Sequence, residues 1–178
     1  MTVAPPPSPR QDGNAEVYEA TAGGKSLVLT IASKVCTDTM SGMPFPKSVT
    51  VALGAQILNG CGGEPATLLH GAWLITQING KPIIAGSTPG LKFETDSKVN
   101  GNGNGSCNRF FGGYQLSGEG LTVGSVGASM MMCDEALMDQ EGQIFKVFKE
   151  LTDFGISGDG KLILRSSDGR TMTAKPDP

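Results

Sequence analysis

The chain has 178 residues, enough for one good domain or for one domain and a smaller module. Its composition, 38% hydrophobic and 17% charged, is typical of a globular protein and excludes a disordered one. The net charge is −3 and no Lys/Arg cluster is interleaved with aromatics, so nucleic-acid binding has almost no support. No apolar run reaches the roughly 18 residues of a transmembrane segment. The 26 Gly and 11 Pro predict many turns between short strands.

Residues 1–14 are expected to form a flexible linker. The prolines from Pro5 to Pro9 favour an extended polyproline conformation, and polar residues follow them. The segment has no apolar run of the kind found in secretion signals. Two interpretations stay open: a cytosolic protein, or a protein whose signal or lipoprotein leader has been removed.

Residues 15–64 predict a small β module. Strands are expected at Ser26–Ala32 and Lys47–Leu53, because apolar residues alternate with others in both. Cys36 and Cys61 lie just outside these two strands. A module of this size buries little core by itself. We therefore expect it to pack on the next domain or to depend on a covalent link.

Residues 65–178 predict a second domain, rich in strands. The dipeptides Asn79-Gly80 and Asp168-Gly169 are strong hairpin signals. Strands are expected at 68–78, 91–95, 98–99, 161–164 and 171–173.

One convincing helix is predicted, from about Asp134 to Leu151. Its apolar stripe contains Leu137, Glu141, Ile144, Phe148 and Leu151, with Phe145 beside it. Gly142 weakens the middle of this helix by about 1 kcal/mol. That cost predicts a close packing contact at Gly142.

The four cysteines fall into two loops of similar length, one in each module: Cys36 to Cys61, and Cys107 to Cys133. No CxxC motif and only one histidine occur, which disfavours a zinc site of the usual spacing. The spacing favours two local disulfides, each contributing about 3 kcal/mol, and hence an oxidising compartment. Four cysteines allow three pairings, and four reduced, buried cysteines in a cytosolic protein remain the alternative.

Short motifs follow one another from Leu68 to Ala174, and their order and spacing resemble the META domain of the HslJ-like heat-shock envelope lipoproteins. The most specific is Cys107-Asn108-Arg109-Phe110-Phe111-Gly112-Gly113-Tyr114. The others are Trp73-Leu74, Ile78-Asn79-Gly80, Pro89–Phe93, Val99–Gly101, Met131-Met132-Cys133, Glu141 with Phe145, Ile156–Gly158 and Leu162–Leu164. The chain departs from the family's pattern at Ser106, where a glycine is usual, and at Ser129-Met130, where a Thr and a basic residue are usual.

The resemblance implies an α+β fold, with an antiparallel β-sheet curved like a half-barrel around one α-helix. It also implies a secreted or envelope-anchored protein, often linked to stress or drug tolerance, with no established enzymatic activity. The first module is similar to a small uncharacterised module of bacterial envelope proteins, which brings no known activity.

No arrangement of residues predicts catalysis, a metal or a cofactor. His70, the only histidine, is expected to be an ordinary loop residue, and no GxSxG elbow occurs. The glycines at 101, 103 and 105 do not form a GxGxxG motif and predict a tight turn. Met130-Met131-Met132 are expected in the core or half-buried in a strand, with a soft-metal or peptide-binding patch as the alternative.

Asn108, Arg109 and Tyr114 are the candidate interaction residues. Asn108 can satisfy turn backbone and Tyr114 can hydrogen-bond from a strand end, so structural roles are expected first. Arg and Tyr are also enriched at binding hot spots, which makes a candidate interaction surface of these three residues.

We therefore expect a non-enzymatic, monomeric META-domain protein of the periplasm or outer membrane, acting as a stress- or drug-tolerance-related binding or stabilising module. Its partner is an unknown envelope protein or ligand, and the full-length precursor is a candidate for a lipid anchor. One alternative is an inhibitor of an extracellular hydrolase, such as a lysozyme or protease. A second is a thiol redox or metal protein that uses Cys107 and Cys133.

Overall fold

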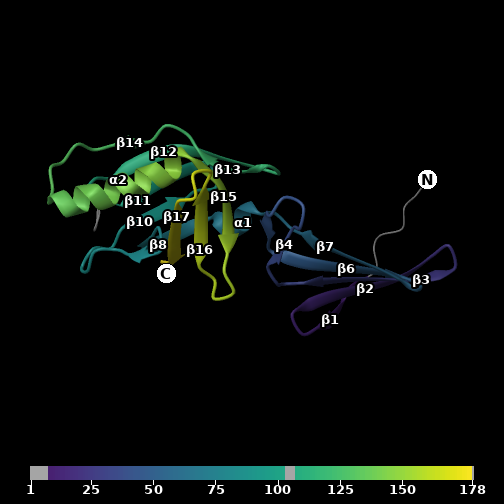
Figure 1. The fold of residues 1–178 in the computed structure, drawn as a ribbon. Coiled ribbons are helices and arrows are strands. Elements are labelled where there is room, and N and C mark those ends of the chain that lie inside the picture. The colour runs from purple at the N-terminus through teal and green to yellow at the C-terminus, as the bar shows by residue number, and fades with distance from the viewer. Residues whose placement is uncertain (1–7, 103–106, 178) are drawn as a thin grey trace. The chain divides into compact units, whose positions relative to one another are not determined.

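The computed structural model describes residues 8–102 and 107–177, which form two compact units, Met1–Pro65 and Ala66–Pro178 (Figure 1). Each unit has its own sheet and its own disulfide. Of the three glycines predicted to form a tight turn, Gly101 lies in a strand and pairs with Phe110, while Gly103 and Gly105 lie outside the described residues. Most of the predicted proline-rich segment also lies outside them.

The first unit is a single antiparallel sheet with the strand order β1-β2-β3-β6-β7 and a short β4-β5 ribbon beside it. Its strands are β1 (Arg10–Asp12), β2 (Ala15–Ala22), β3 (Lys25–Ala32), β4 (Cys36–Thr37), β5 (Pro44–Phe45), β6 (Lys47–Leu53) and β7 (Gln56–Gly62). The predicted strands at 26–32 and 47–53 are β3 and β6. The expected linker differs in its last residues, because Arg10–Asp12 pair with Ala15–Val17 as a hairpin.

The core of the first unit is small. Among its described residues, the buried apolar side chains are Ala15, Val17, Met43 and Pro44. The disulfide Cys36–Cys61 joins the excursion between β3 and β6 to strand β7. The covalent link expected from the sequence is therefore present, and it supplements a core that buries little apolar surface.

The second unit contains most of the secondary structure. Its elements are α1 (Ala66–Leu69), β8 (Gly71–Ile78), β9 (Lys81–Pro82), β10 (Gly90–Phe93), β11 (Lys98–Asn102), β12 (Phe110–Ser117), β13 (Gly120–Val123), β14 (Gly127–Ala128), α2 (Glu135–Lys149), β15 (Leu151–Ile156), β16 (Leu162–Ser166) and β17 (Thr171–Pro176). No helix in the described part of the chain is long and apolar enough to cross a membrane.

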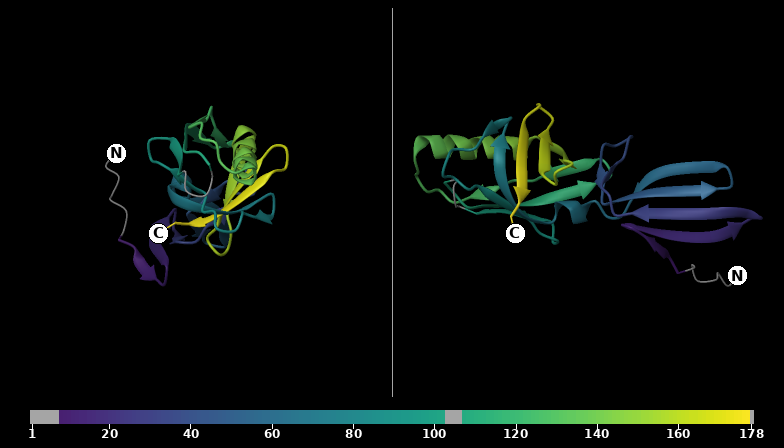
Figure 2. Two further views of the ribbon diagram at one scale, coloured as in Figure 1. Left: turned by 90° about the vertical axis from the view of Figure 1, so that its left-hand side faces the viewer. Right: turned by 90° about the horizontal axis from the view of Figure 1, so that it is seen from below.

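The strands of the second unit form a nearly closed antiparallel sheet, with the order β13-β12-β11-β10-β8-β17-β16-β15. Its two end strands, β13 and β15, come together, so that a Cβ placed on Gly120 would meet the carbonyl oxygen of Thr152. Helix α2 packs against β13, β16 and β17 and buries Ile144, Val147 and Phe148 (Figure 2). The expected α+β fold is confirmed, and the sheet closes further than a half-barrel.

Helix α2 begins at Glu135 and ends at Lys149, close to the predicted bounds. Leu151, which the stripe placed in the helix, is the first residue of β15. The close contact predicted at Gly142 is wrong, because a Cβ there would meet nothing within 4 Å. Leu68 and Leu69, predicted to start a strand, are instead the last two residues of α1, and the Leu69 carbonyl accepts a hydrogen bond from Trp73 Nε1 at 2.9 Å.

Both predicted hairpin turns are present. Asn79 and Gly80 have φ values of 53° and 73° and connect β8 to β9. Gly169, with φ of 84°, lies in the turn between β16 and β17. Strand β17 then returns beside β8, and the Asp177 amide donates to the Ala72 carbonyl at 2.9 Å. The last strand of this unit is thus the neighbour of its first.

Candidate functional site

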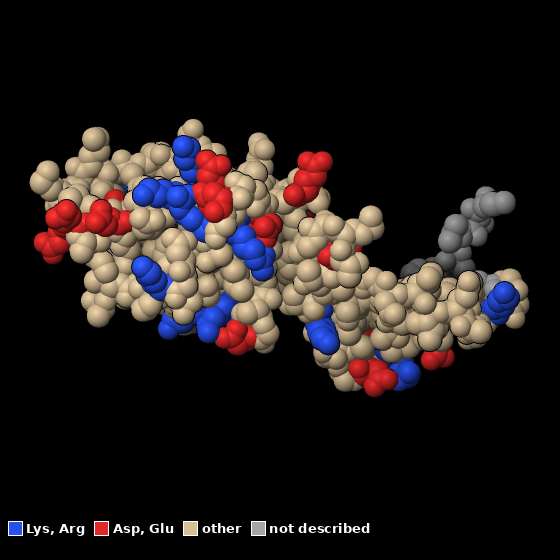
Figure 3. Space-filling view, viewed as in Figure 1, with Lys and Arg blue, Asp and Glu red and all other residues tan. Residues whose placement is uncertain are grey.

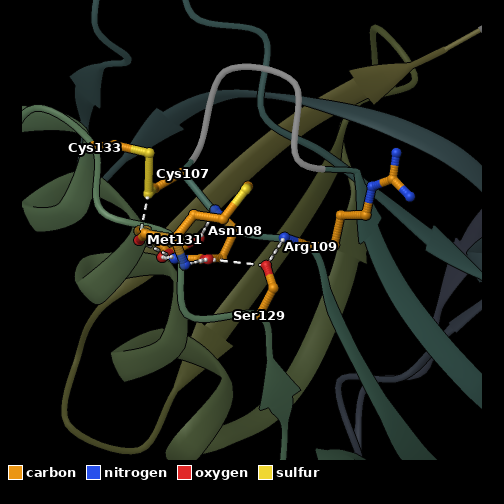
Figure 4. The surroundings of a disulfide bond; sticks show 7 residues. Cys107, Asn108, Arg109, Ser129, Met131 and Cys133 are labelled. Carbon is orange, nitrogen blue, oxygen red and sulfur yellow. Dashed lines mark hydrogen bonds between the residues drawn. A yellow bond between two sulfur atoms is a disulfide. The ribbon is translucent and has the colours of Figure 1, made fainter.

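The Cys107–Cys133 disulfide fixes the residues that precede β12 to those that precede α2, with a Cα–Cα distance of 5.7 Å (Figure 4). Cys107 is buried, with 2% of its surface exposed. Its Sγ lies 3.1 Å from the Met131 carbonyl oxygen. Because a disulfide sulfur carries no proton, this is a close contact and not a hydrogen bond.

Asn108 is the centre of a buried hydrogen-bond network beside the disulfide. Its Oδ1 accepts from the Met131 amide at 2.7 Å and from Ser129 Oγ at 2.9 Å. Its own amide and its Nδ2 donate to the two carboxylate oxygens of Glu141, at 2.7 and 2.9 Å. With 7% of its surface exposed, Asn108 uses its whole side-chain amide within the domain. The structural role expected for it is therefore the one that its contacts describe.

Glu141 was missed by the sequence analysis as the partner of Asn108. It lies on the buried face of α2 with 6% of its surface exposed. A buried carboxylate requires hydrogen-bond donors, and Asn108 supplies two. A carboxylate within an apolar helix stripe was the signal that could have predicted such a bond.

Ser129 stands where a Thr is usual in the family, and it keeps the side-chain hydroxyl. Its hydroxyl donates to Asn108 Oδ1 and accepts from the Arg109 amide at 3.2 Å. The Ser129 amide in turn donates to the Arg109 carbonyl at 3.0 Å. A hydroxyl is therefore what this position needs, and Ser supplies it as Thr would.

Met130, Met131 and Met132 are exposed, by 99%, 54% and 93% of their surface, in a loop between β14 and α2. The prediction of core or half-buried strand positions is wrong. The backbone of Met131 supplies the amide and carbonyl contacts to Asn108 and Cys107, so its fixed backbone leaves the side chain outside. We call residues 129–133 the methionine loop: its backbone is anchored and its three thioether side chains face solvent.

Two more exposed side chains lie nearby, one just before β12 and one within it. Arg109 is exposed and its guanidinium points away from the Asn108 network (Figure 4). Phe111 has 64% of its surface exposed and pairs with Gly127 across β12 and β14. The sequence analysis named Arg109 and missed Phe111, since an aromatic residue in a strand is expected inside.

Tyr114 lies inside, with 5% of its surface exposed. Its hydroxyl donates to the Glu94 carbonyl at 2.8 Å and lies 3.0 Å from His70 Nε2. Because the hydroxyl proton goes to Glu94, Nε2 of His70 must carry a proton and donate to the hydroxyl oxygen. Of the three candidate interaction residues, the structure thus leaves Arg109 outside and places Asn108 and Tyr114 in internal bonds.

An open pocket of about 420 Å³ lies beside this pair, lined by His70, Lys92, Glu94 and Asp96 among others. Burial raises the pKa of Tyr114 above its ordinary value, and the negative charge of Asp96 raises it further. The neutral phenol is therefore favoured, which suits a hydrogen-bond donor and opposes a tyrosinate nucleophile.

The four cysteines form the pairs Cys36–Cys61 and Cys107–Cys133, the pairing favoured by the spacing. No free cysteine remains, so Cys107 and Cys133 are present here as the oxidised pair and carry no thiolate. Within residues 8–102 and 107–177, no group of three His, Cys, Asp or Glu side chains is placed to hold a metal ion.

These features define a disulfide-containing α+β domain whose antiparallel sheet nearly closes around one long helix. The chain belongs to the META domain family, which matches residues 66–178. No curated protein matches the chain.

Two solved structures have a similar fold. The NMR structure of a protein from Burkholderia xenovorans shares 19% sequence identity at a TM-score of 0.53, covering 69% of this chain and 94% of that chain. The NMR structure of a second protein shares 26% identity at a TM-score of 0.51, covering 65% of this chain and 96% of that chain.

Proposed function

We propose that this protein is a non-enzymatic META-domain module of the bacterial cell envelope that binds or stabilises a partner under stress. The observation that carries the proposal is the methionine loop: its backbone is held by Asn108 and a disulfide, and its side chains are free to contact a partner. Disulfides in both units support an oxidising compartment, such as the periplasm or the outer surface.

A non-catalytic role is supported by the use of the reactive groups. His70 donates to Tyr114, Glu141 accepts from Asn108, and the cysteines are paired. Glu141 and Cys107 are buried and make contacts within the fold, whereas His70 makes its internal bond at the edge of an open pocket.

Methionine and arginine side chains suit a binding surface. Thioether side chains are flexible and polarisable, so they adapt to apolar partner surfaces of different shape. Arg109 adds a cation that can pair with a carboxylate or phosphate of the partner. An anchored backbone lowers the ordering cost of binding.

The compartment is tested by the intact mass of protein alkylated under denaturing conditions, with and without reductant. Purified envelope material should contain both disulfides and take up label only after reduction. Four free thiols in protein from its natural host would remove the envelope assignment.

The binding role is tested in host cells lacking this gene and exposed to heat or to an envelope-directed drug. The intact protein should restore survival, and a variant with Met130, Met131 and Met132 changed to Ser should not. The matched control is Met40→Ser, because Met40 is 96% exposed in the other unit. Full protection by the triple variant, at equal protein level, would exclude the methionine loop as the binding surface.

An inhibitor of an extracellular hydrolase is the second candidate, and the same loop favours it. Inhibitors present an exposed segment on a rigid backbone, as residues 129–133 do here. Titration of a panel of lysozymes and proteases tests it, and no inhibition at micromolar protein would remove it.

A further inference from the structure

Among the described residues of the first unit, no helix or second sheet covers one face of the five-stranded sheet, and the strand pairings show that this face is apolar. The strands of this sheet are drawn in Figure 1. Side chains on neighbouring strands that pair directly point to the same face. The pairings place Tyr18, Leu29, Val51 and Leu58 in one row across β2, β3, β6 and β7.

The flanking rows on the same face are apolar as well. Leu27 pairs with Leu53 on one side of this row, and Ile31 pairs with Val49 on the other. We call this surface the apolar face. Its residues on β3 and β6 are only half-buried, and Leu58 at the edge has 67% of its surface exposed.

The opposite face has different chemistry. There Val17, Thr30, Thr50 and Asn59 form the corresponding row, and Thr50 Oγ1 donates to Asn59 Oδ1 at 2.9 Å. Cys61 also lies on this face, so its disulfide draws the Cys36 segment to that side. The buried Ala15 and Val17 belong to the same side. The unit therefore covers its mixed face in part and leaves the apolar face open.

We propose that a second copy of this chain covers the apolar face, and that two sheets stack face to face as a β-sandwich. Stacked sheets pack about 10 Å apart with their apolar faces interdigitated. A monomeric protein rarely exposes an apolar patch larger than a few hundred Å². This proposal departs from the monomer expected from the sequence.

The charges at the two ends of the face favour a second copy as the occupant. Glu16 lies at one end, on the strand position that pairs with Ile31, and Lys25 lies at the other end, opposite Ala22. Consider a two-fold axis that lies between the two stacked sheets and runs perpendicular to the strands. It brings the Glu16 end of one copy over the Lys25 end of the other. The symmetry therefore creates two Glu16–Lys25 pairs. Neither residue makes an ion pair inside the described part of the chain.

The size of the face sets the expected affinity. Strands β2, β3, β6 and β7 are seven or eight residues long. At a spacing of about 4.8 Å and a rise of about 3.4 Å per residue they cover about 450 Å² in projection. Two copies then bury about 900 Å², and more when side-chain relief is counted, which is the low end of specific interfaces. We expect a reversible dimer with a dissociation constant in the micromolar range.

Sedimentation equilibrium of the full chain, from about 1 to about 300 µM, tests the proposal. The mass should rise with concentration from monomer to dimer. Val51→Lys should abolish the rise, because it places a charge in the centre of the apolar face. Thr50→Lys is the matched control on the adjacent residue and opposite face, and it should leave dimerisation within about threefold. A monomer at every concentration, or a dimer that survives Val51→Lys, overturns the proposal.

The end charges give a test that does not alter the core of the face. Glu16→Lys should weaken the dimer by about threefold to tenfold, as expected for exposed pairs made repulsive. Glu16→Lys/Lys25→Glu should restore it. Carbodiimide cross-linking of a mixture of isotope-labelled and unlabelled protein should join Glu16 of one copy to Lys25 of the other. A dimer without this cross-link, or without restoration by the double variant, overturns the face-to-face arrangement.

Discussion

Glu141 and Asn108 are joined by two hydrogen bonds, at 2.7 and 2.9 Å, that use both carboxylate oxygens and both amide nitrogens. One partner lies in the middle of α2 and the other directly follows Cys107. The pair therefore fixes the helix to the start of β12 at a point where the disulfide already limits movement.

Replacing this carboxylate should destabilise the domain. In Glu141→Gln the new amide N–H₂ faces one of the two donors of Asn108, so that donor loses its acceptor. The free energy of unfolding should fall by about 1–3 kcal/mol. Urea unfolding of the full chain measures it. Asp139→Asn, an exposed change on the same helix, should stay within about 0.5 kcal/mol. Equal effects of the two changes would contradict the assigned role of Glu141.

Gly142 offers a stabilising change. A Cβ there would meet nothing within 4 Å, so Gly142→Ala should gain about 1 kcal/mol from helix propensity. Ala136→Gly, at an exposed position of the same helix, should lose a similar amount. Thermal and urea unfolding would show both shifts, and a loss of stability in Gly142→Ala would indicate a packing contact that the structure does not have.

Gly120 should tolerate no side chain. Its φ is +143°, and an added Cβ would collide with the Thr152 carbonyl oxygen where β13 meets β15. Since backbone atoms on both sides must shift, Gly120→Ala should cost about 2–3 kcal/mol. Gly118→Ala is the control in the same hairpin, because a Cβ there meets nothing within 4 Å. If both variants unfold at the same urea concentration, β13 and β15 are not in close contact.

The phenol of Tyr114 should have a higher pKa than the phenol of a free tyrosine. Tyr18 and Tyr114 are the only tyrosines, so Tyr18→Phe leaves one phenol to follow by tyrosinate absorbance. Burial and the charge of Asp96 raise the pKa of Tyr114 in the folded protein. In the unfolded chain the phenol has a pKa of about 10. Folded protein then holds the proton more tightly, and stability falls as pH rises from about 10 to the folded pKa.

The control for this fall is Tyr18→Phe/Tyr114→Phe, which should lack the part of the alkaline destabilisation that Tyr114 causes. Unfolding of the two variants at a series of pH values measures the difference. A native phenol that ionises at or below the ordinary tyrosine pKa would contradict the enclosed position of Tyr114.

Features set by local interactions were predictable from the sequence. Asn79-Gly80 adopts the positive φ values of a tight hairpin, since these residues accept that conformation with little strain. The alternation in Lys47–Leu53 predicted β6 with its actual bounds. The helix stripe was correct where α2 packs, at Ile144 and Phe148.

Features set by tertiary contacts could not be predicted from the sequence. Apolar character suggested that Met130 to Met132 are inside, but Asn108 binds the backbone of Met131 and turns the side chains outward. Glycine in a helix suggested a close neighbour at Gly142, and none is present. The place of Glu141 in the apolar stripe indicates that it needs a donor, but it does not identify Asn108 as that donor, because 33 positions separate the two residues.

Strand β17 lies beside β8, with Pro176 opposite Trp73. The META unit therefore enters and leaves its sheet at one place, so it can be spliced into a turn of a host protein without stretching either flank. The Asn79-Gly80 turn and the turn between β16 and β17 lie at the opposite end of the sheet, away from this junction. A fold of this kind can be inserted into another gene as a single piece, because both of its connections leave from one place.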